Sequence, residues 1–157
     1  MTGNGSVPLW TGRVAALFTS PTTGAAMQPR GELDVLAGVG IAGDRYAAPD
    51  ARAGQALTLI EEEAVEAVAG EYGIELSAAD TRRNVVTRDV ALNHLVGREF
   101  RVGPVLVRGV RLAEPCSHLE KLTGIRRLRL SLVHRGGLRA DVLESGRIRV
   151  GDPVTPA

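Results

Sequence analysis

The segment EFRVGPVLVRGVRL, residues 99–112, decides the fold class of this chain. Apolar and polar residues alternate around Gly109 within 105–112, and alternation with period two predicts a strand that is buried on one face. A Gly-Pro pair at 103–104 separates this strand from a shorter one over 99–102, because such a pair favours a turn. The segment therefore predicts two short strands joined by a tight connection.

Similar short strands, separated by glycine-containing turns, recur along the rest of the sequence. The last two form a predicted hairpin around the turn at 144–146. The strands are expected over residues 13–20, 31–35, 55–60, 84–87, 128–133, 138–143 and 147–150.

One long helix is expected, over residues 61–72, where three glutamates favour the helix N-terminus and Gly73 is suited to the C-terminal stop. Shorter helical turns are expected over 90–95 and 117–122. Many short strands with one substantial helix favour a mainly β barrel or sandwich with some α+β character, rather than a parallel α/β sheet.

The overall composition predicts a soluble single domain. A chain of 157 residues suits one domain, which we place at 13–157 after a flexible lead-in over 1–12, with Trp10 as a potential anchor. The net charge of +1 excludes the broad basic surface of a non-specific nucleic-acid binder. No apolar run approaches the ~18 residues of a membrane span, and no signal pattern opens the chain, so we expect a cytoplasmic protein with no membrane partner.

Cys116 is the single cysteine, so neither an intrachain disulfide nor a CxxC metal motif can form. It opens the predicted helix at 117–122, where a helix N-terminus favours the thiolate, a nucleophile and soft metal ligand. Burial as a small apolar side chain is the alternative. His118 and His134 are candidate partners for a Cys-His catalytic pair, although they and His94 lack a structural zinc spacing.

Arginines next to glycine-rich segments predict a site for phosphate or another oxyanion, because backbone N–H groups can join the guanidinium groups. Arg82 and Arg83 precede Asn84, whose amide can bind a polar edge. Arg45 follows Gly43-Asp44, and Arg135 precedes two glycines. Surface solvation is the alternative for each arginine, since most charged side chains are exposed.

Read in order, six blocks of the sequence resemble the MOSC family, the domain named for the C-terminal part of molybdenum cofactor sulfurases. The blocks are GVGIAGDRY (38–46), QALTLIEEEAVEAV (55–68), RRNVVT (82–87), LVGREFRVG (95–103), EPCSHLEKLTG (114–124) and GGLRADVLESGRIRVGDPV (136–154). The resemblance covers nearly the whole chain and implies a β-rich barrel with a few short helices, of the pyruvate-kinase barrel type. The sequence lacks the His-Gly-Gly that many members have before the second block.

The resemblance also implies roles for particular residues. Cys116 matches the cysteine that carries sulfur or ligates molybdenum. Arg82 and Asn84 match the block that holds the anionic molybdopterin cofactor. The predicted cofactor-binding set is completed by Arg45, Arg83, His118 and Arg135.

We therefore expect a small molybdoenzyme that reduces N-hydroxylated or similar oxygenated compounds. A single cysteine cannot hold an iron–sulfur cluster, so electrons would come from a separate flavoprotein or iron–sulfur protein. The alternatives are a non-catalytic carrier of the molybdenum cofactor or of a persulfide on Cys116, and a hydrolase that uses Cys116 with a histidine. Pyridoxal phosphate is not expected on this chain, and a homodimer remains an alternative to a monomer.

Overall fold

A computed structural model describes residues 9–157. Residues 1–8 of the predicted flexible lead-in lie outside the described part, whereas Trp10 is partly buried against the core and β1 begins at Gly12. The strands are β1 (Gly12–Thr19), β2 (Gln28–Arg30), β3 (Glu32–Leu36), β4 (Gly40–Ile41), β5 (Leu57–Glu61), β6 (Val85–Arg88), β7 (Glu99–Val102), β8 (Val105–Leu112), β9 (Leu138–Glu144), β10 (Gly146–Arg149) and β11 (Pro153–Pro156). The helices are α1 (Glu62–Tyr72), α2 (Ser117–Thr123) and α3 (Leu128–Ser131), with 3₁₀ turns η1 (Ala78–Thr81) and η2 (Leu92–Leu95).

The larger sheet closes into a seven-stranded barrel in the order β11-β7-β8-β9-β5-β6-β1. The closing pair is β1 with β11, which aligns Gly12 with Val154. β2 pairs with the far end of β1 and lies outside the closed ring. This arrangement confirms the predicted mainly β barrel with a few short helices.

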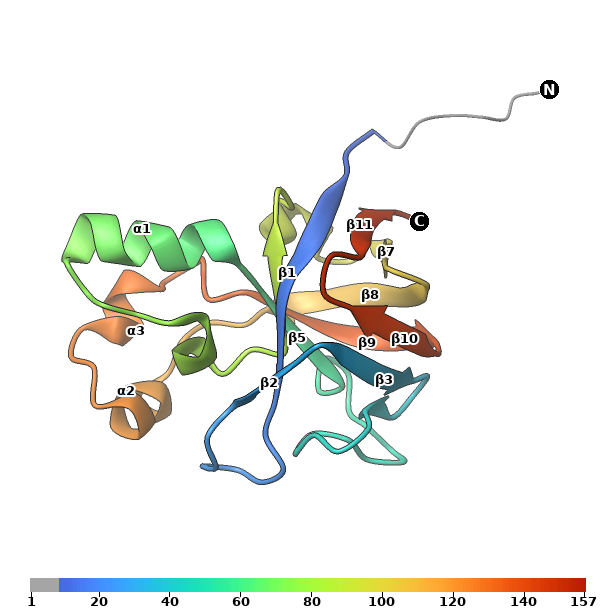
Figure 1. Ribbon diagram of the computed structural model, residues 1–157, viewed down its shortest axis with the longest axis horizontal. Coiled ribbons are helices and arrows are strands. Elements are labelled where there is room, and N and C mark those ends of the chain that lie inside the picture. Colours follow the sequence, from blue (N-terminus) through green and yellow to red (C-terminus); the bar gives the residue numbers. More distant parts are fainter. Residues whose placement is uncertain (1–8) are drawn as a thin grey trace.

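The pairing of β5 with β6 is parallel, and the other barrel pairs are antiparallel. A parallel pair needs a long crossover, which α1 and η1 supply. The prediction of α1 is confirmed: Glu62 and Glu63 lie in its first turn, and Gly73 ends it in the left-handed conformation. Figure 1 shows the three helices gathered at one side of the barrel.

Two apolar cores result from this arrangement. One fills the barrel and centres on side chains such as Phe100, Leu57 and Leu138. The other lies between the helices and the outer face of the barrel, and it includes Val68 of α1 and Leu132. With aromatic residues at only 3%, aliphatic side chains provide most of both cores.

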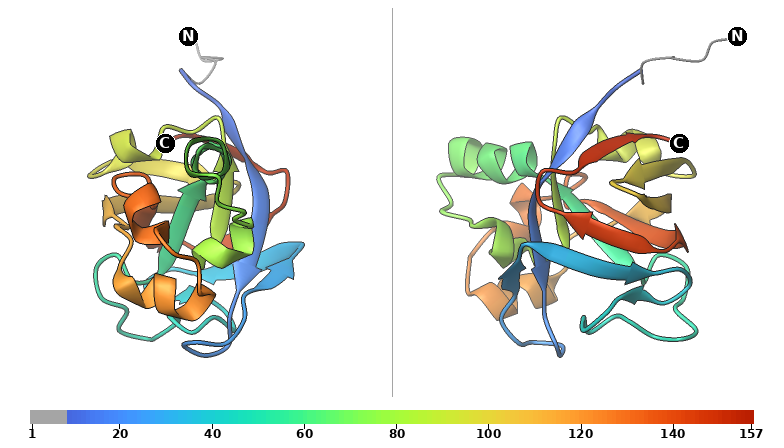
Figure 2. Two further views of the ribbon diagram at one scale, coloured as in Figure 1. Left: turned by 90° about the vertical axis from the view of Figure 1, so that its left-hand side faces the viewer. Right: turned by 45° about the vertical axis from the view of Figure 1, so that its right-hand side comes forward.

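A small second sheet, in the order β10-β3-β4, lies beside the barrel (Figure 2). The predicted hairpin between the last two long strands is wrong, because β10 pairs with β3. Both edges of β9 are already paired, with β5 and β8. The chain therefore leaves the barrel at Ser145, whose hydroxyl accepts a hydrogen bond from Ala37 N.

The strand predicted over 128–133 is also wrong, because this segment forms α3. Leu128, Leu130 and Leu132 alternate with polar residues and mimic a strand. However, Leu128 and Leu132 are buried whereas Leu130 is 55% exposed. Burial at i and i+4 is the helical spacing, so the burial of Leu128 and Leu132 in the second core overrides the local alternation.

No helix in the described part of the chain is long and apolar enough to span a membrane.

Candidate functional site

A pocket of about 90 Å³ lies where five segments distant in sequence converge. They are the loop after β1, the turn after Gly43, the residues before β6, the segment that leads into α2, and the start of β9. Of the predicted site residues, the pocket brings together five: Arg45, Arg82, Arg83, Cys116 and His118. Its other lining residues are Thr23, Gly24, Tyr46, Glu114, Pro115, Leu119, Leu122 and Arg139.

Arg82 projects into this pocket from a strained backbone position. Its φ of 61° lies in the left-handed region, which is unusual for a residue with a side chain. Nη1 donates a hydrogen bond to Ala25 O at 2.8 Å. Nη2 is buried and has no hydrogen-bond partner among the described residues. Because a buried donor without an acceptor is costly, this nitrogen is suited to an acceptor supplied by a ligand.

Arg83 is held rigidly beside Arg82. Its Nε donates to Gly136 O and its Nη2 to Ala113 O, both at 2.8 Å. Burial, and then the positive charge of Arg139, lower the pKa of Arg83 to about 10. The guanidinium is therefore short of negative charge, and an anion in the pocket would supply it.

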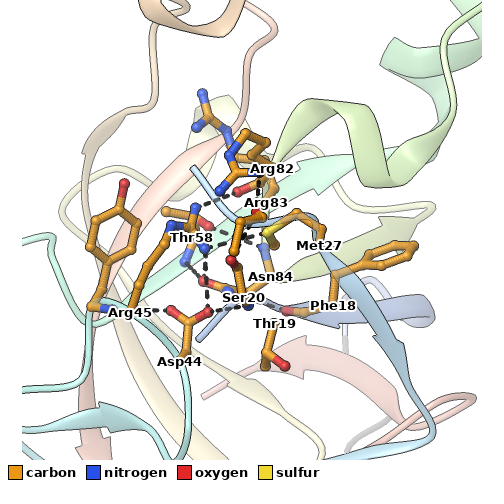
Figure 3. Close-up of polar contacts among 12 residues, drawn as sticks. Phe18, Thr19, Ser20, Met27, Asp44, Arg45, Thr58, Arg82, Arg83 and Asn84 are labelled. Atoms are coloured by element: carbon orange, nitrogen blue, oxygen red, sulfur yellow. Dashed lines mark hydrogen bonds and ion pairs between the residues drawn. The ribbon is translucent and has the colours of Figure 1, made fainter. Parts of the chain in front are cut away.

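Arg45 lies almost entirely inside the protein, with 4% of its side chain exposed. Its Nη1 lies 3.3 Å from an Asp44 carboxylate oxygen. That carboxylate also accepts a hydrogen bond from Ser20 N at 3.0 Å. The guanidinium lies 4.3 Å from the ring centre of Tyr46, and its Nη2 donates to Arg82 O at 3.1 Å. Figure 3 shows Arg45 reaching from Asp44 toward Arg82 and Arg83.

The pocket is strongly positive. Four arginines line it, against Glu114 as the single lining carboxylate. Glu114 accepts hydrogen bonds from His134 N at 2.7 Å and pairs with the His134 ring at 2.7 Å; the backbone bond in particular lowers the pKa of Glu114. Burial, and then the charge of Arg45, lower the pKa of Arg82. An anionic ligand fits these surroundings.

Arg139 is the arginine that the sequence reading missed. Leu138 and Ala140 on either side of it are buried in the barrel. Alternation along β9 therefore directs Arg139 out of the barrel interior, and its place next to the Gly136-Gly137 pair was the available signal.

Cys116 is exposed and directly precedes α2, as the sequence predicts. His118 lines the same pocket, but no hydrogen bond joins the two side chains. His134 lies outside the pocket and pairs with Glu114. Among residues 9–157, no group of three or more His, Cys, Asp or Glu side chains could hold a metal.

Asn84 and Arg135 do not line the pocket. Asn84 is fully buried, with its Oδ1 accepting from Thr58 N and Oγ1 at 3.2 and 3.0 Å and its Nδ2 donating to Phe18 O at 3.2 Å. Arg135 donates to Ser131 O and pairs with Glu71. Asn84 thus fixes the turn that presents Arg82 and Arg83, and Arg135 joins α3 to α1.

A second cleft of about 360 Å³ adjoins the pocket. The two cavities share Gly24, Arg82 and Leu122, so Arg82 stands between them. Together they offer room for a ligand longer than the first pocket alone would hold.

A family profile described as MOSC domain matches residues 42–155, which include every lining residue except Thr23 and Gly24. The chain belongs to the MOSC domain family. Among curated proteins, none matches this MOSC sequence at a significant level.

Solved structures share the fold of this MOSC domain. The YuaD protein of Bacillus subtilis is 17% identical with a TM-score of 0.77, over 93% of this chain and 97% of that one. YiiM of Geobacillus stearothermophilus is 18% identical with a TM-score of 0.75, over 93% and 75%. YiiM of Escherichia coli is 20% identical with a TM-score of 0.66, over 92% and 69%.

Proposed function

We propose that this MOSC domain binds the molybdenum cofactor and reduces N-hydroxylated or similar oxygenated compounds with electrons from a separate protein. The observation that supports this most is the combination of four arginines, a buried unpartnered guanidinium nitrogen and one exposed thiol around a single pocket. Few ligands need all three, whereas an anionic pterin with a bound metal does.

The residues present fit the group. Molybdopterin carries a phosphate, which guanidinium groups bind in a bidentate manner. Arg82 has a free donor for it, and Arg83 is fixed next to Arg82 by two carbonyl groups. A pterin also has donor and acceptor edges that backbone groups near Gly24 and Pro115 can match.

Each side chain of the pocket would have its own role toward the cofactor. Arg82, Arg83 and Arg139 would bind the anion, and Arg45 would hold Arg82 in place. Cys116 would ligate molybdenum, which when bound supplies the redox chemistry and an exchangeable oxygen position. His118, exposed at the same rim, would provide a proton near the reacting centre.

The proposed reaction needs two electrons from a separate donor protein. A hydroxylamine R–NH–OH takes up two electrons and two protons, the N–O bond breaks, and R–NH2 and water leave. The electrons would come from an iron–sulfur or flavin protein, because this chain, with one cysteine, cannot hold an iron–sulfur cluster.

A sulfur carrier is the second candidate, and the exposure of Cys116 favours it. An accessible thiol can hold a persulfide and pass its sulfur to an acceptor. The hydrolase alternative has less support, since no histidine is hydrogen-bonded to this thiol.

Metal and pterin analysis of protein produced in a molybdenum-replete host tests the proposal. We expect about one molybdenum and one pterin per chain in the wild type, and loss of the metal in Cys116→Ser. As a matched control, Ser117→Ala alters the next exposed residue and should retain the metal. Absence of molybdenum together with a persulfide on Cys116, seen by mass spectrometry, would support the carrier instead.

A further inference from the structure

The segment formed by α2, α3 and their connection faces the viewer in the left panel of Figure 2. It adjoins the pocket, because Leu119 and Leu122 of α2 line it. We call it the α2–α3 face. It exposes three apolar side chains, Leu122, Leu130 and Val133, at 38%, 55% and 44%. Its exposed cations are Lys121, Arg126, Arg127 and Arg129.

These four cations have no ion-pair partner among the described residues, although carboxylates pair with arginines elsewhere on the surface. Arg88, Arg101, Arg108 and Arg147 each lie within 3.1 Å of a Glu or Asp oxygen. On the α2–α3 face, Glu120 is the nearby carboxylate, and its Oε1 accepts a hydrogen bond from Arg129 N at 2.9 Å. The face is therefore a local positive patch on a chain whose net charge is only +1.

Leu122 connects this face to the site. It lines both the pocket and the second cleft, and it is exposed between Lys121 and the turn that ends α2. A protein that docks over Leu122 would thus come to rest at the mouth of the pocket that contains Cys116.

We propose that the α2–α3 face is the docking surface for an acidic one-electron donor protein, an inference that rests on the proposed reductase function. A redox reaction in this pocket needs electrons from outside, and the donor must approach near Cys116. Transient electron-transfer interfaces are small, with charge complementarity guiding the encounter. Exposed leucine and valine together with cations that lack ion-pair partners match a protein partner that offers an apolar contact and carboxylates.

Binding of an acidic plant-type [2Fe–2S] ferredoxin, with an acidic flavodoxin as second probe, tests the surface. In the triple variant Arg126→Glu, Arg127→Glu, Arg129→Glu, we expect affinity at low ionic strength to fall at least about tenfold. The control is Arg13→Glu, Arg98→Glu, Arg149→Glu, which changes three exposed arginines away from the face and gives the same net charge. The control should lose less than about threefold, and circular dichroism checks that both fold.

Lys121 provides an independent readout, because it is the single lysine of the chain. Carbodiimide condenses a lysine amine with a carboxylate into an amide, so cross-links to ferredoxin should map to Lys121. In Lys121→Arg, which keeps the charge, the cross-link should disappear while binding persists. Equal affinity of both triple variants, or cross-links elsewhere, would overturn the docking surface. The proposal would also be overturned if the MOSC domain bound duplex DNA or anionic vesicles more tightly than it binds ferredoxin or flavodoxin.

Separate measurements test the reductase function and the docking surface. Turnover driven by dithionite in the charge-reversal variant should equal that of the wild type, since none of the three arginines lines the pocket. Absence of molybdenum and of dithionite-driven turnover in the wild type would overturn the reductase. Normal turnover with no preference of ferredoxin for this face would overturn the docking surface alone.

Discussion

Arg45 donates a hydrogen bond from its guanidinium to the backbone carbonyl of Arg82 at 3.1 Å, so one pocket arginine fixes the position of another. The contact joins two turns that are far apart in sequence. Asp44 forms an ion pair with the Arg45 guanidinium. Arg82 has its left-handed conformation as the residue that ends η1, where its N–H donates to Ala79 O. The bond from the almost fully buried Arg45 holds its carbonyl in place.

Arg82→Lys should weaken retention of the cofactor. Lysine can replace the bond to Ala25 O but leaves no second nitrogen for the ligand. A hydrogen bond between charged groups contributes about 1.5–3 kcal/mol, so affinity should fall roughly 10- to 100-fold. Molybdenum and pterin content per chain measures this, with Arg135→Lys as the control outside the pocket. Equal retention in both variants would remove Arg82 from the site.

Asn84→Ala should lower stability rather than cofactor affinity. The change removes the side-chain acceptor of the buried Thr58 N and Oγ1 and the side-chain donor to the Phe18 carbonyl. Each unpaired buried group costs about 1–3 kcal/mol, so chemical denaturation should show a loss of that size or more. The fraction that remains folded should still take up cofactor. Selective loss of cofactor without loss of stability would instead restore the direct contact expected from the sequence.

Whether residues 128–133 form a helix or a strand can be tested by comparing the stability losses of Leu132→Ala and Leu130→Ala. Leu132 is buried in the second core, and its truncation should cost about 2–5 kcal/mol. Leu130 is exposed, and its truncation should change stability by about 0.5 kcal/mol or less. In a strand the two side chains would share one face, so equal losses in urea denaturation would contradict α3.

Glu61→Gln should stabilise the protein at neutral pH. Burial, reinforced by Glu63, raises the pKa of Glu61, against the opposing hydrogen bond from Leu92 N. A carboxyl whose pKa is higher in the folded state favours folding only while protonated. Stability is therefore lost as pH rises from the unfolded value near 4.5 through the folded pKa. The melting temperature of the variant should exceed that of the wild type at pH 7, and the gap should close toward pH 4; a constant gap would contradict this linkage.

Local patterns predicted α1 and most of the longer strands, because alternation and end signals act within a few residues. They missed the short strands β2, β4 and β11, of which β11 closes the barrel. The β8 strand matches its expected bounds, and Gly73 ends α1 as expected. The predictions were wrong where the secondary structure depends on contacts with distant parts of the chain. α3 depends on which leucines are buried in the second core, and β10 depends on an edge of β3 more than a hundred residues earlier in the chain.

The same distinction applies to the site. Arg45, Arg82 and Arg83 could be found because they adjoin glycine-rich or paired basic motifs. Arg139 also lies near a glycine pair, Gly136-Gly137, but its place at the pocket depends on how β9 lies beside β5. The structural role of Asn84 could not be found, because it depends on how β5 and β6 lie next to each other in the barrel.

The seam between β1 and β11 has a consequence for how the protein is made. Gly12 leaves the ribosome early, yet its partner Val154 is synthesised after almost every other strand. Contacts between residues so distant in sequence slow folding. The barrel therefore closes only after residue 154 has been synthesised, and until then Gly12 and Arg13 lack their partners on β11.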